Sequence, residues 1–213
     1  MDRLLRISDA IGYAVAAIGK AGGWLLLPLT FIMMFDVLAR KFRPLQMLVN
    51  DTWLKEYLSS TKLQEWEWHL HGVVLLLAFG FAYVCDKHVR IDGWRDRRTP
   101  KTQALVEIVG ICVAMLPFCG LMLYEAAHFV EMSYVSNEGS AAMTGLSHRW
   151  IIKSFLIVGY VLLILAGVAM LLRAIYFYLR PPPEKPPLRI VVLEEPPMPG
   201  GPPPGGASLV SHS

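Results

Sequence analysis

Charged residues are scarce in this sequence. Asp, Glu, Lys and Arg make up only 17% of its 213 residues, whereas 54% are hydrophobic and the mean hydropathy is +0.45. A soluble domain usually carries about 25% charged residues. This deficit excludes an ordinary soluble domain and indicates a membrane protein. The formal net charge is only +3, so the composition does not indicate a nucleic-acid partner.

Cysteines are few, and the common catalytic motifs are missing. The three cysteines, Cys85, Cys112 and Cys119, lie in apolar runs and lack the spacing of a zinc or disulfide framework. The sequence contains no GxSxG, HExxH or P-loop pattern. It therefore predicts buried thiols, no bound cofactor or metal, and no enzymatic activity.

Long apolar runs are what the sequence does contain. A bilayer core about 30 Å thick requires roughly 20 apolar residues in a helix. Four runs predict membrane spans at about 20–40, 66–86, 106–127 and 153–174. The expected fold class is an all-α integral membrane protein, with a four-helix transmembrane domain at 19–178 and additional short amphipathic surface helices. Internal repeats, which often surround a midplane transport site, are absent, and this favours an accessory subunit over a carrier.

Basic residues predict the orientation of these spans. With four spans, the N-terminus, the middle loop and the C-terminus share one side of the membrane. That side holds 13 of the 20 Lys and Arg residues, and the other side holds 7. Because basic residues favour the cytoplasm, both termini are predicted to be cytoplasmic.

Three segments outside the spans have distinct compositions. Residues 1–18 carry apolar side chains at helical spacing, which predicts an amphipathic N-terminal segment on the membrane surface. Residues 44–62 are predicted to insert a second, interfacial helix. Residues 181–213 hold 11 of the 15 prolines, so we expect a Pro/Gly-rich disordered cytoplasmic tail.

The stretch EWEWHLHG, residues 65–72, places unusual polarity at the start of the second span. On a helix, Glu65 lies one turn before His69, and Glu67 lies on a different side of the axis. Polar side chains near lipid usually face protein or water. The stretch is therefore either an interfacial anchor or a polar contact with another subunit or with the loop before the fourth span.

Histidines support a rival interpretation. His69, His71 and His128 are all predicted at the non-cytoplasmic side, and two histidines on neighbouring helices can ligate a haem iron. The alternative function is thus a small haem-binding membrane anchor subunit of a respiratory complex. A single-chain sensor or chaperone-like membrane protein is a third hypothesis.

Several motifs, in order, resemble one family. LQEWEWHL precedes the second span and DKHVRID follows it, LPFC lies in the third span, and FDVLARKF follows the first. The pattern SY–EGS–GL–RWIIK extends from Ser133 to Lys153, with Ser147 where the family usually has proline. Together they resemble the small membrane subunit (DctQ-like) of tripartite ATP-independent periplasmic (TRAP) transporters over roughly residues 20–175. The segment before LQEWEWHL resembles the longer, mannitol/chloroaromatic-type branch.

The resemblance implies a function and partners. A periplasmic substrate-binding protein would capture an organic acid, and a large membrane subunit (DctM-like) would import it with a sodium gradient. The small subunit would anchor the large subunit's scaffold in the bacterial inner membrane, in contact with membrane lipid. It would hold no sodium or substrate ligand of its own, because sodium coupling is expected in the large partner.

The resemblance also implies residue roles. One matched set would form a subunit interface or structural polar network: Glu65, Trp66, Glu67, Trp68, His69, His88, Arg90 and Asp92. A second set, before and at the fourth span, would form a docking surface for the binding protein: Glu138, Ser140, Arg149, Trp150 and Lys153.

Overall fold

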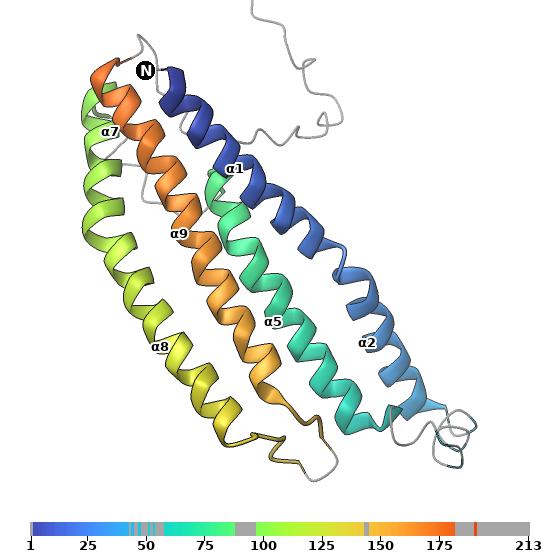
Figure 1. The fold of residues 1–213 in the computed structure, drawn as a ribbon. Coiled ribbons are helices and arrows are strands. Elements are labelled where there is room, and N and C mark those ends of the chain that lie inside the picture. Colours follow the sequence, from blue (N-terminus) through green and yellow to red (C-terminus); the bar gives the residue numbers. More distant parts are fainter. Residues whose placement is uncertain are drawn as a thin grey trace, which may run out of the picture.

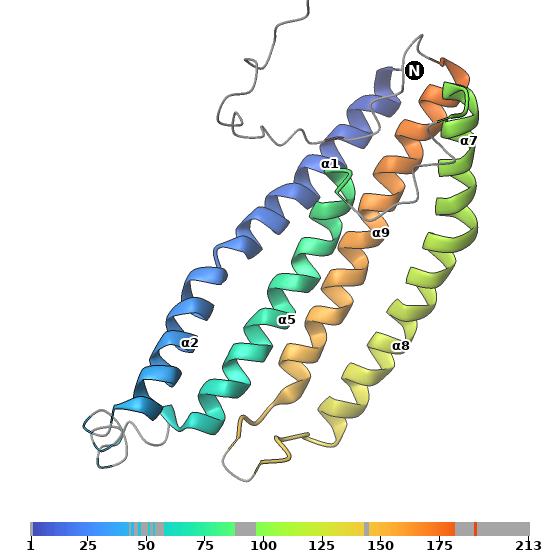
Figure 2. The same ribbon diagram turned by 180° about the vertical axis from the view of Figure 1, so that it is seen from behind.

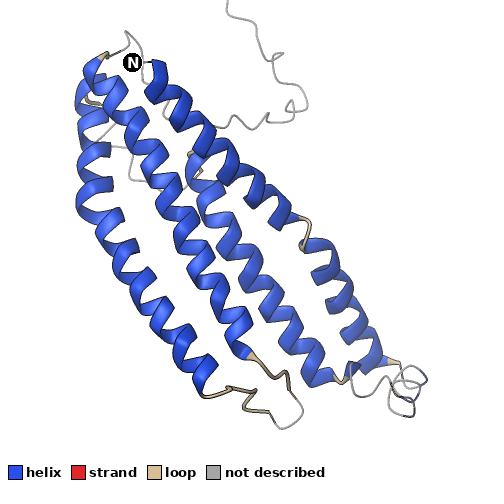
Figure 3. Cartoon of the chain, in the orientation of Figure 1, coloured by secondary structure: helices blue, strands red, loops and turns tan. Residues whose placement is uncertain are grey.

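The computed structural model describes residues 2–42, 44, 47, 51, 53, 58–87, 97–142, 145–181 and 190. Every regular element within this part of the chain is a helix (Figure 3). Four helical stretches are long and apolar enough to cross a membrane: Arg3–Lys41, Ser60–Val84, Pro100–Val135 and Arg149–Leu179. The predicted fold class, an all-α protein with four membrane-spanning helices, is confirmed.

The first stretch is made of two helices, α1 (Asp2–Gly23) and α2 (Leu26–Lys41). The break falls at Trp24 and Leu25, four and three residues before Pro28. A proline ring clashes with the carbonyl group four residues earlier, so a helix running straight through Trp24 is disfavoured. The bend between the two helices is visible in both ribbon views (Figures 1 and 2).

Helix α1 packs inside the bundle rather than lying apart from it. It contacts both α5 (Ser60–Val84) and α9 (Arg149–Leu179). Ser8 is fully buried and its hydroxyl donates to the Ala169 carbonyl at 2.8 Å. The sequence placed residues 1–18 on the membrane surface because their apolar residues form one stripe. In the structure the buried face of α1 includes Ser8, Val15 and Ala16, whereas Ile7 and Ile18, two members of the stripe, are 51% and 44% exposed.

The third stretch changes its helical winding in the middle. It consists of α7 (Pro100–Val109), a π-helical turn (Gly110–Met115) and α8 (Leu116–Val135). Pro117 is the second residue after the π-helical turn and has no N–H to donate to a carbonyl in that turn. Wider π turns accommodate such interruptions inside long helices. The sequence signal for this irregularity was the proline itself.

The helices lie side by side in the order α2, α5, α9 and α8, with α1 against α5 and α9 (Figures 1 and 2). Helix α9 is central: 33% of its apolar window is buried, against 11% in the third stretch. Small side chains on α9 allow this close packing, because Ala166, Ala169 and Ala174 are all completely buried. Helices that approach through small residues gain dispersion contacts along their backbones.

The bundle has two distinct ends, which we name by what they hold. The terminus end holds the start of α1 and the end of α9 (Figure 1). The loop end holds the connections from α2 to α5 and from α8 to α9. The predicted interfacial helix at 44–62 lies largely outside the described residues, as does the tail beyond Pro181. Ile190 is described: it is 5% exposed, and its N–H donates to the Val84 carbonyl at 3.0 Å.

Large apolar side chains remain exposed on the outer helices. On α2, Phe31 is 71% exposed, and on the third stretch Val113 is also 71% exposed. In water such an apolar surface would promote aggregation, but a lipid or a protein neighbour can cover it. A row of helices, unlike a closed bundle, keeps these faces available on both flanks.

Candidate functional site at the loop end

The Glu65 carboxylate connects α5 to the loop between α8 and α9. Glu65 is 7% exposed and accepts hydrogen bonds from the Ser140 hydroxyl and from the Leu146 backbone N–H. Arg149 and His69 lie close enough to interact with it electrostatically. A buried carboxylate is stable only when charges and donors satisfy it. The loop supplies both donors, and the start of α9 supplies the cation.

The loop closes on itself around this carboxylate. The Ser140 N–H donates to the Leu146 carbonyl at 3.0 Å, so the two residues that bind Glu65 also bind each other. Gly145 lies inside this ring, and a Cβ atom there would be 2.7 Å from Glu65 Oε1. A larger residue at this position has no space. The loop conformation therefore depends on a glycine as well as on the carboxylate.

Three further contacts secure the start of α9 to the loop and to α8. Lys153 forms an ion pair with Glu138, and its ammonium also lies 3.8 Å from the Phe129 ring centroid. The hydrogen bond from Lys153 lowers the pKa of Glu138 below its ordinary value of 4.5. Trp150 meets the Tyr134 ring edge-on, with 5.3 Å between centroids. These contacts hold the last turn of α8 against the first turns of α9.

The structure therefore brings members of both predicted residue sets into one cluster. The sequence assigned Glu65 and Trp68 to a polar network, and assigned Ser140 and Arg149 to a separate docking surface. In the structure Glu65 binds Ser140, and the Arg149 guanidinium lies 5.3 Å from the Trp68 ring centroid. Among the contacts considered for EWEWHLHG, the one observed within this chain is with the loop before α9.

Glu67 faces the opposite neighbour, α2, as its angular separation from Glu65 requires. It interacts electrostatically with Asp36 and Arg40. Asp36 is only 3% exposed; it pairs with Arg40 one turn later and accepts from the Ser60 hydroxyl at 3.0 Å. Sequence reasoning missed this second polar cluster. The signal was present, since an acid and an arginine four positions apart on a helix can pair.

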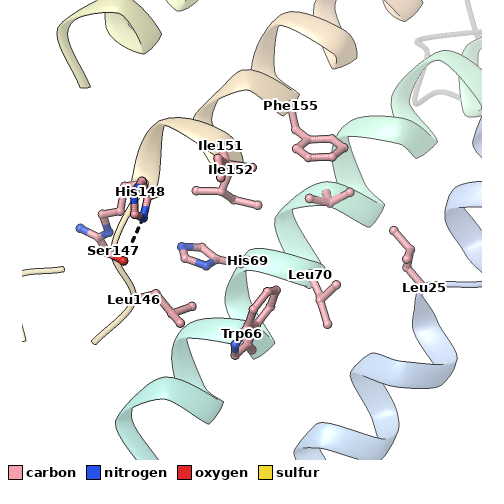
Figure 4. Close-up of a pocket in the computed structure, with 12 residues that line it drawn as sticks. Leu25, Trp66, His69, Leu70, Leu146, Ser147, His148, Ile151, Ile152 and Phe155 are labelled. Atoms are coloured by element: carbon pink, nitrogen blue, oxygen red, sulfur yellow. Dashed lines mark hydrogen bonds between the residues drawn. The ribbon is translucent and has the colours of Figure 1, made fainter. Parts of the chain in front are cut away.

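His69 lines a pocket between α5 and α9, with a volume of about 420 Å³ (Figure 4). Trp66 lies on the same wall, and Ser147 and His148 lie across from it. His69 is 6% exposed, and its Nε2 atom has no hydrogen-bond partner in the described part of the chain. His148, the residue before α9, has a positive φ of 61°. That backbone turn aims the loop across the pocket mouth.

Among the described residues, His69 and His128 do not line a common pocket. His128 projects from α8, where its side chain is 62% exposed and lies 3.9 Å from Glu131 of the same helix. It does not line the pocket that contains His69. The haem-anchor hypothesis is therefore not supported. His88, Arg90 and Asp92, which the sequence added to the polar network, lie outside the described residues.

The polar contacts around Glu65 join helices and the loop to one another. Within the described residues, no group of three or more His, Cys, Asp or Glu side chains could hold a metal ion. Each carboxylate discussed above has a cation, a hydroxyl or a backbone N–H beside it. Such an arrangement fixes the relative positions of helices and presents a defined loop surface.

Comparison with known proteins gives the family. Residues 29–176 match the family model described as tripartite ATP-independent periplasmic transporters, DctQ component. Comparisons with curated proteins and with solved structures gave no match. The matched range covers more than half of the chain and includes α5, α8 and most of α2 and α9. The family resemblance predicted from the motifs is thus confirmed, whereas the longer mannitol/chloroaromatic branch stays a prediction. The chain belongs to the DctQ family of tripartite ATP-independent periplasmic transporter components.

Proposed function

We propose that this multi-pass membrane protein is the small scaffold subunit of a sodium-driven TRAP transporter for an organic acid. DctQ proteins are components of tripartite transporters, so two further components complete the machine. The proposed partners are a large, DctM-like membrane subunit and a periplasmic substrate-binding protein. The sodium and substrate ligands would belong to the large subunit and the binding protein, and this chain would anchor the stationary part of the complex.

One observation supports the scaffold role above the others. The buried or paired carboxylates have partners within this chain, while large apolar side chains on α2 are exposed. Glu65 and Glu138 are bound by the loop and by α9, so neither needs a transported ion. Meanwhile Phe31, Met34 and Val37 of α2 are each more than half exposed. A large apolar partner can pack on such a flank without displacing any ion pair. A rigid row of helices is well suited to bracing a moving neighbour.

The proposed orientation puts the terminus end in the cytoplasm and the loop end in the periplasm. The excess of Lys and Arg on the terminus side supports this orientation. The loop at 136–148 would then face the compartment of the binding protein. Its residues Glu138, Ser140 and Arg149, with Trp150 and Lys153 behind them, form the proposed docking surface. Because Glu65 fixes this loop, the surface would be presented in one conformation.

Purification and uptake together test the proposal. The tagged chain, extracted in mild detergent, should recover a much larger, highly apolar partner encoded beside it. Vesicles containing both membrane subunits should take up the acid only with the binding protein and an inward sodium gradient. Vesicles containing this chain alone should show no uptake. Uptake by the chain alone, or purification without any large partner, would contradict the scaffold role.

A further inference from the structure

The pocket between α5 and α9 has a gradient of polarity along its length. Both helices begin at the loop end, so their first residues lie at the mouth and their later residues lie deeper. Ser147, His148 and Arg149 line the mouth, and Val73 and Phe155 line the inner part. From Trp66 to Val73 the wall of α5 extends about 10 Å at 1.5 Å per residue. Polar groups therefore lie at one end of the pocket only.

A membrane lipid has the same arrangement, with its polar headgroup at the membrane surface and its apolar acyl chains deeper. Trp66 and Trp68 are 45% and 51% exposed near the start of α5, where tryptophan rings favour the headgroup level. The inner part of the pocket then lies at the depth of the acyl chains. Ile151, which is 50% exposed, lies on the pocket rim, so the pocket can be reached from the side of the bundle.

His69 supplies an independent sign that the pocket takes a polar ligand group. Its side chain points from α5 across the pocket toward the start of α9 (Figure 4). The Nε2 atom is buried and lacks a partner among the described residues. A buried polar atom without a hydrogen bond costs free energy, so a ligand oxygen beside Nε2 would be favoured. An acceptor atom is what a phosphate or an ester carbonyl offers.

Arg149, the one Lys or Arg among the described residues that line the pocket, favours an anionic ligand. Arg149 lines the pocket, and its stacking over Trp68 leaves guanidinium N–H groups that can donate to an anion. Glu65 interacts with Arg149, but its two oxygens are already bound by Ser140 and Leu146. An arginine beside an apolar pocket suits a molecule with a phosphate head and a hydrocarbon tail.

We propose that the α5–α9 pocket binds one anionic phospholipid, with an acyl chain against Val73 and Phe155 and the phosphate near Arg149 and His69. The proposal rests on the four-span membrane fold and not on the transporter function. Phospholipid is favoured over a helix of the large subunit because the pocket is polar at one end, and that end lies at the level of Trp66 and Trp68. A bound lipid would fill the space between the two helices that hold the cluster around Glu65.

Native mass spectrometry of the full chain tests the proposal. The chain would be released from nanodiscs of phosphatidylcholine containing phosphatidylglycerol as the anionic probe. One phosphatidylglycerol per chain should be retained in preference to phosphatidylcholine. Arg149→Gln should weaken this retention about tenfold, since a hydrogen bond to a charged group is lost. Arg97→Gln removes an exposed charge that does not line the pocket, and it should leave the retention unchanged.

A second variant distinguishes the contribution of the apolar pocket to lipid binding from the contribution of the Arg149 charge. Leu70→Trp fills the apolar part of the pocket and keeps every cation, and it should also abolish the retained lipid while circular dichroism shows intact helices. Equal retention by the parent chain and both variants would overturn the proposal. It would also be overturned if, in the purified complex, Leu70→Trp released the large subunit and left the number of bound lipids unchanged. That result would identify a protein segment as the occupant.

Discussion

Glu65 of α5 accepts a hydrogen bond from the backbone N–H of Leu146, a residue 81 positions later in the chain. This single contact joins the second span to the loop that precedes the fourth. The Ser140 hydroxyl shares the same carboxylate, so the loop is held at two points. In the proposed orientation, a loop fixed in this way would present one conformation to the binding protein, whereas an unrestrained loop would lose conformational entropy on binding.

Replacing Glu65 by Gln should release the loop. Glutamine keeps the size of the side chain but loses the charge that strengthens bonds from Ser140 and Leu146. We expect a loss of about 1–3 kcal/mol in the free energy of unfolding. Thermal unfolding in detergent and the rate of proteolysis within residues 136–148 would measure it. Glu67→Gln is the matched control, because Glu67 faces α2 and should leave the rate of loop cleavage unchanged.

Replacing Gly145 by Ala should disturb the same loop from the other side. The added Cβ would lie 2.7 Å from Glu65 Oε1 and closer still to Ser140, so one of the two must move. Overpacking of this kind typically costs about 1–3 kcal/mol. At Gly139 a Cβ would meet nothing within 4 Å, which makes Gly139→Ala the control. Equal melting temperatures for the two alanine variants would contradict the role assigned to Gly145.

Hydropathy predicted the four spans because the need to bury about 20 residues in lipid leaves a long, unmistakable signal. It did not predict where α1 lies. An amphipathic stripe such as that of residues 1–18 can face lipid headgroups or other helices, and the sequence alone does not distinguish the two. In the structure α1 packs against α9, where the Ser8 hydroxyl donates a hydrogen bond to the Ala169 carbonyl.

The sequence predicted the local geometry of the candidate site but not its tertiary contacts. The helical spacing correctly put Glu65 and Glu67 on different sides of α5, because 3.6 residues per turn fixes that angle. The partners could not be predicted, because Ser140 and Asp36 reach α5 through tertiary packing and not through local spacing. The sequence likewise did not predict the pocket beside His69, because its walls come from segments that are distant along the chain.

The ion pair between Glu138 and Lys153 should make the loop sensitive to acid. Because Lys153 lowers the pKa of Glu138 in the folded protein, the pair contributes to stability above the ordinary value of 4.5 and loses that contribution as pH falls through the lower, folded value. The melting temperature of Glu138→Gln should therefore lie below that of the parent chain at pH 7. The two should converge as the pH falls below 4.5 and through the lowered pKa of Glu138. A difference that stays constant from pH 7 to pH 3 would argue against the pair.

Ile190 should hold the C-terminal segment against the terminus end of the bundle. Its N–H binds the Val84 carbonyl, and its side chain occupies the space that Gly12 leaves open on α1. A Cβ at position 12 would lie 2.6 Å from Ile190 Cγ2, so Gly12→Ala should expel the side chain.

Trypsin provides the measurement for this contact, because it cleaves after arginine, and a protease can bind the bond between Arg189 and Ile190 only if Ile190 leaves its contacts with Val84 and Gly12. Gly12→Ala should speed cleavage there about tenfold or more, since removing a buried isoleucine from its contacts costs about 2 kcal/mol or more. Gly23→Ala adds the same methyl group to α1 where it meets nothing within 4 Å, and it should cleave at the parental rate. If both variants were cleaved at that rate while their helix content stayed equal, Ile190 would not be what restrains the segment.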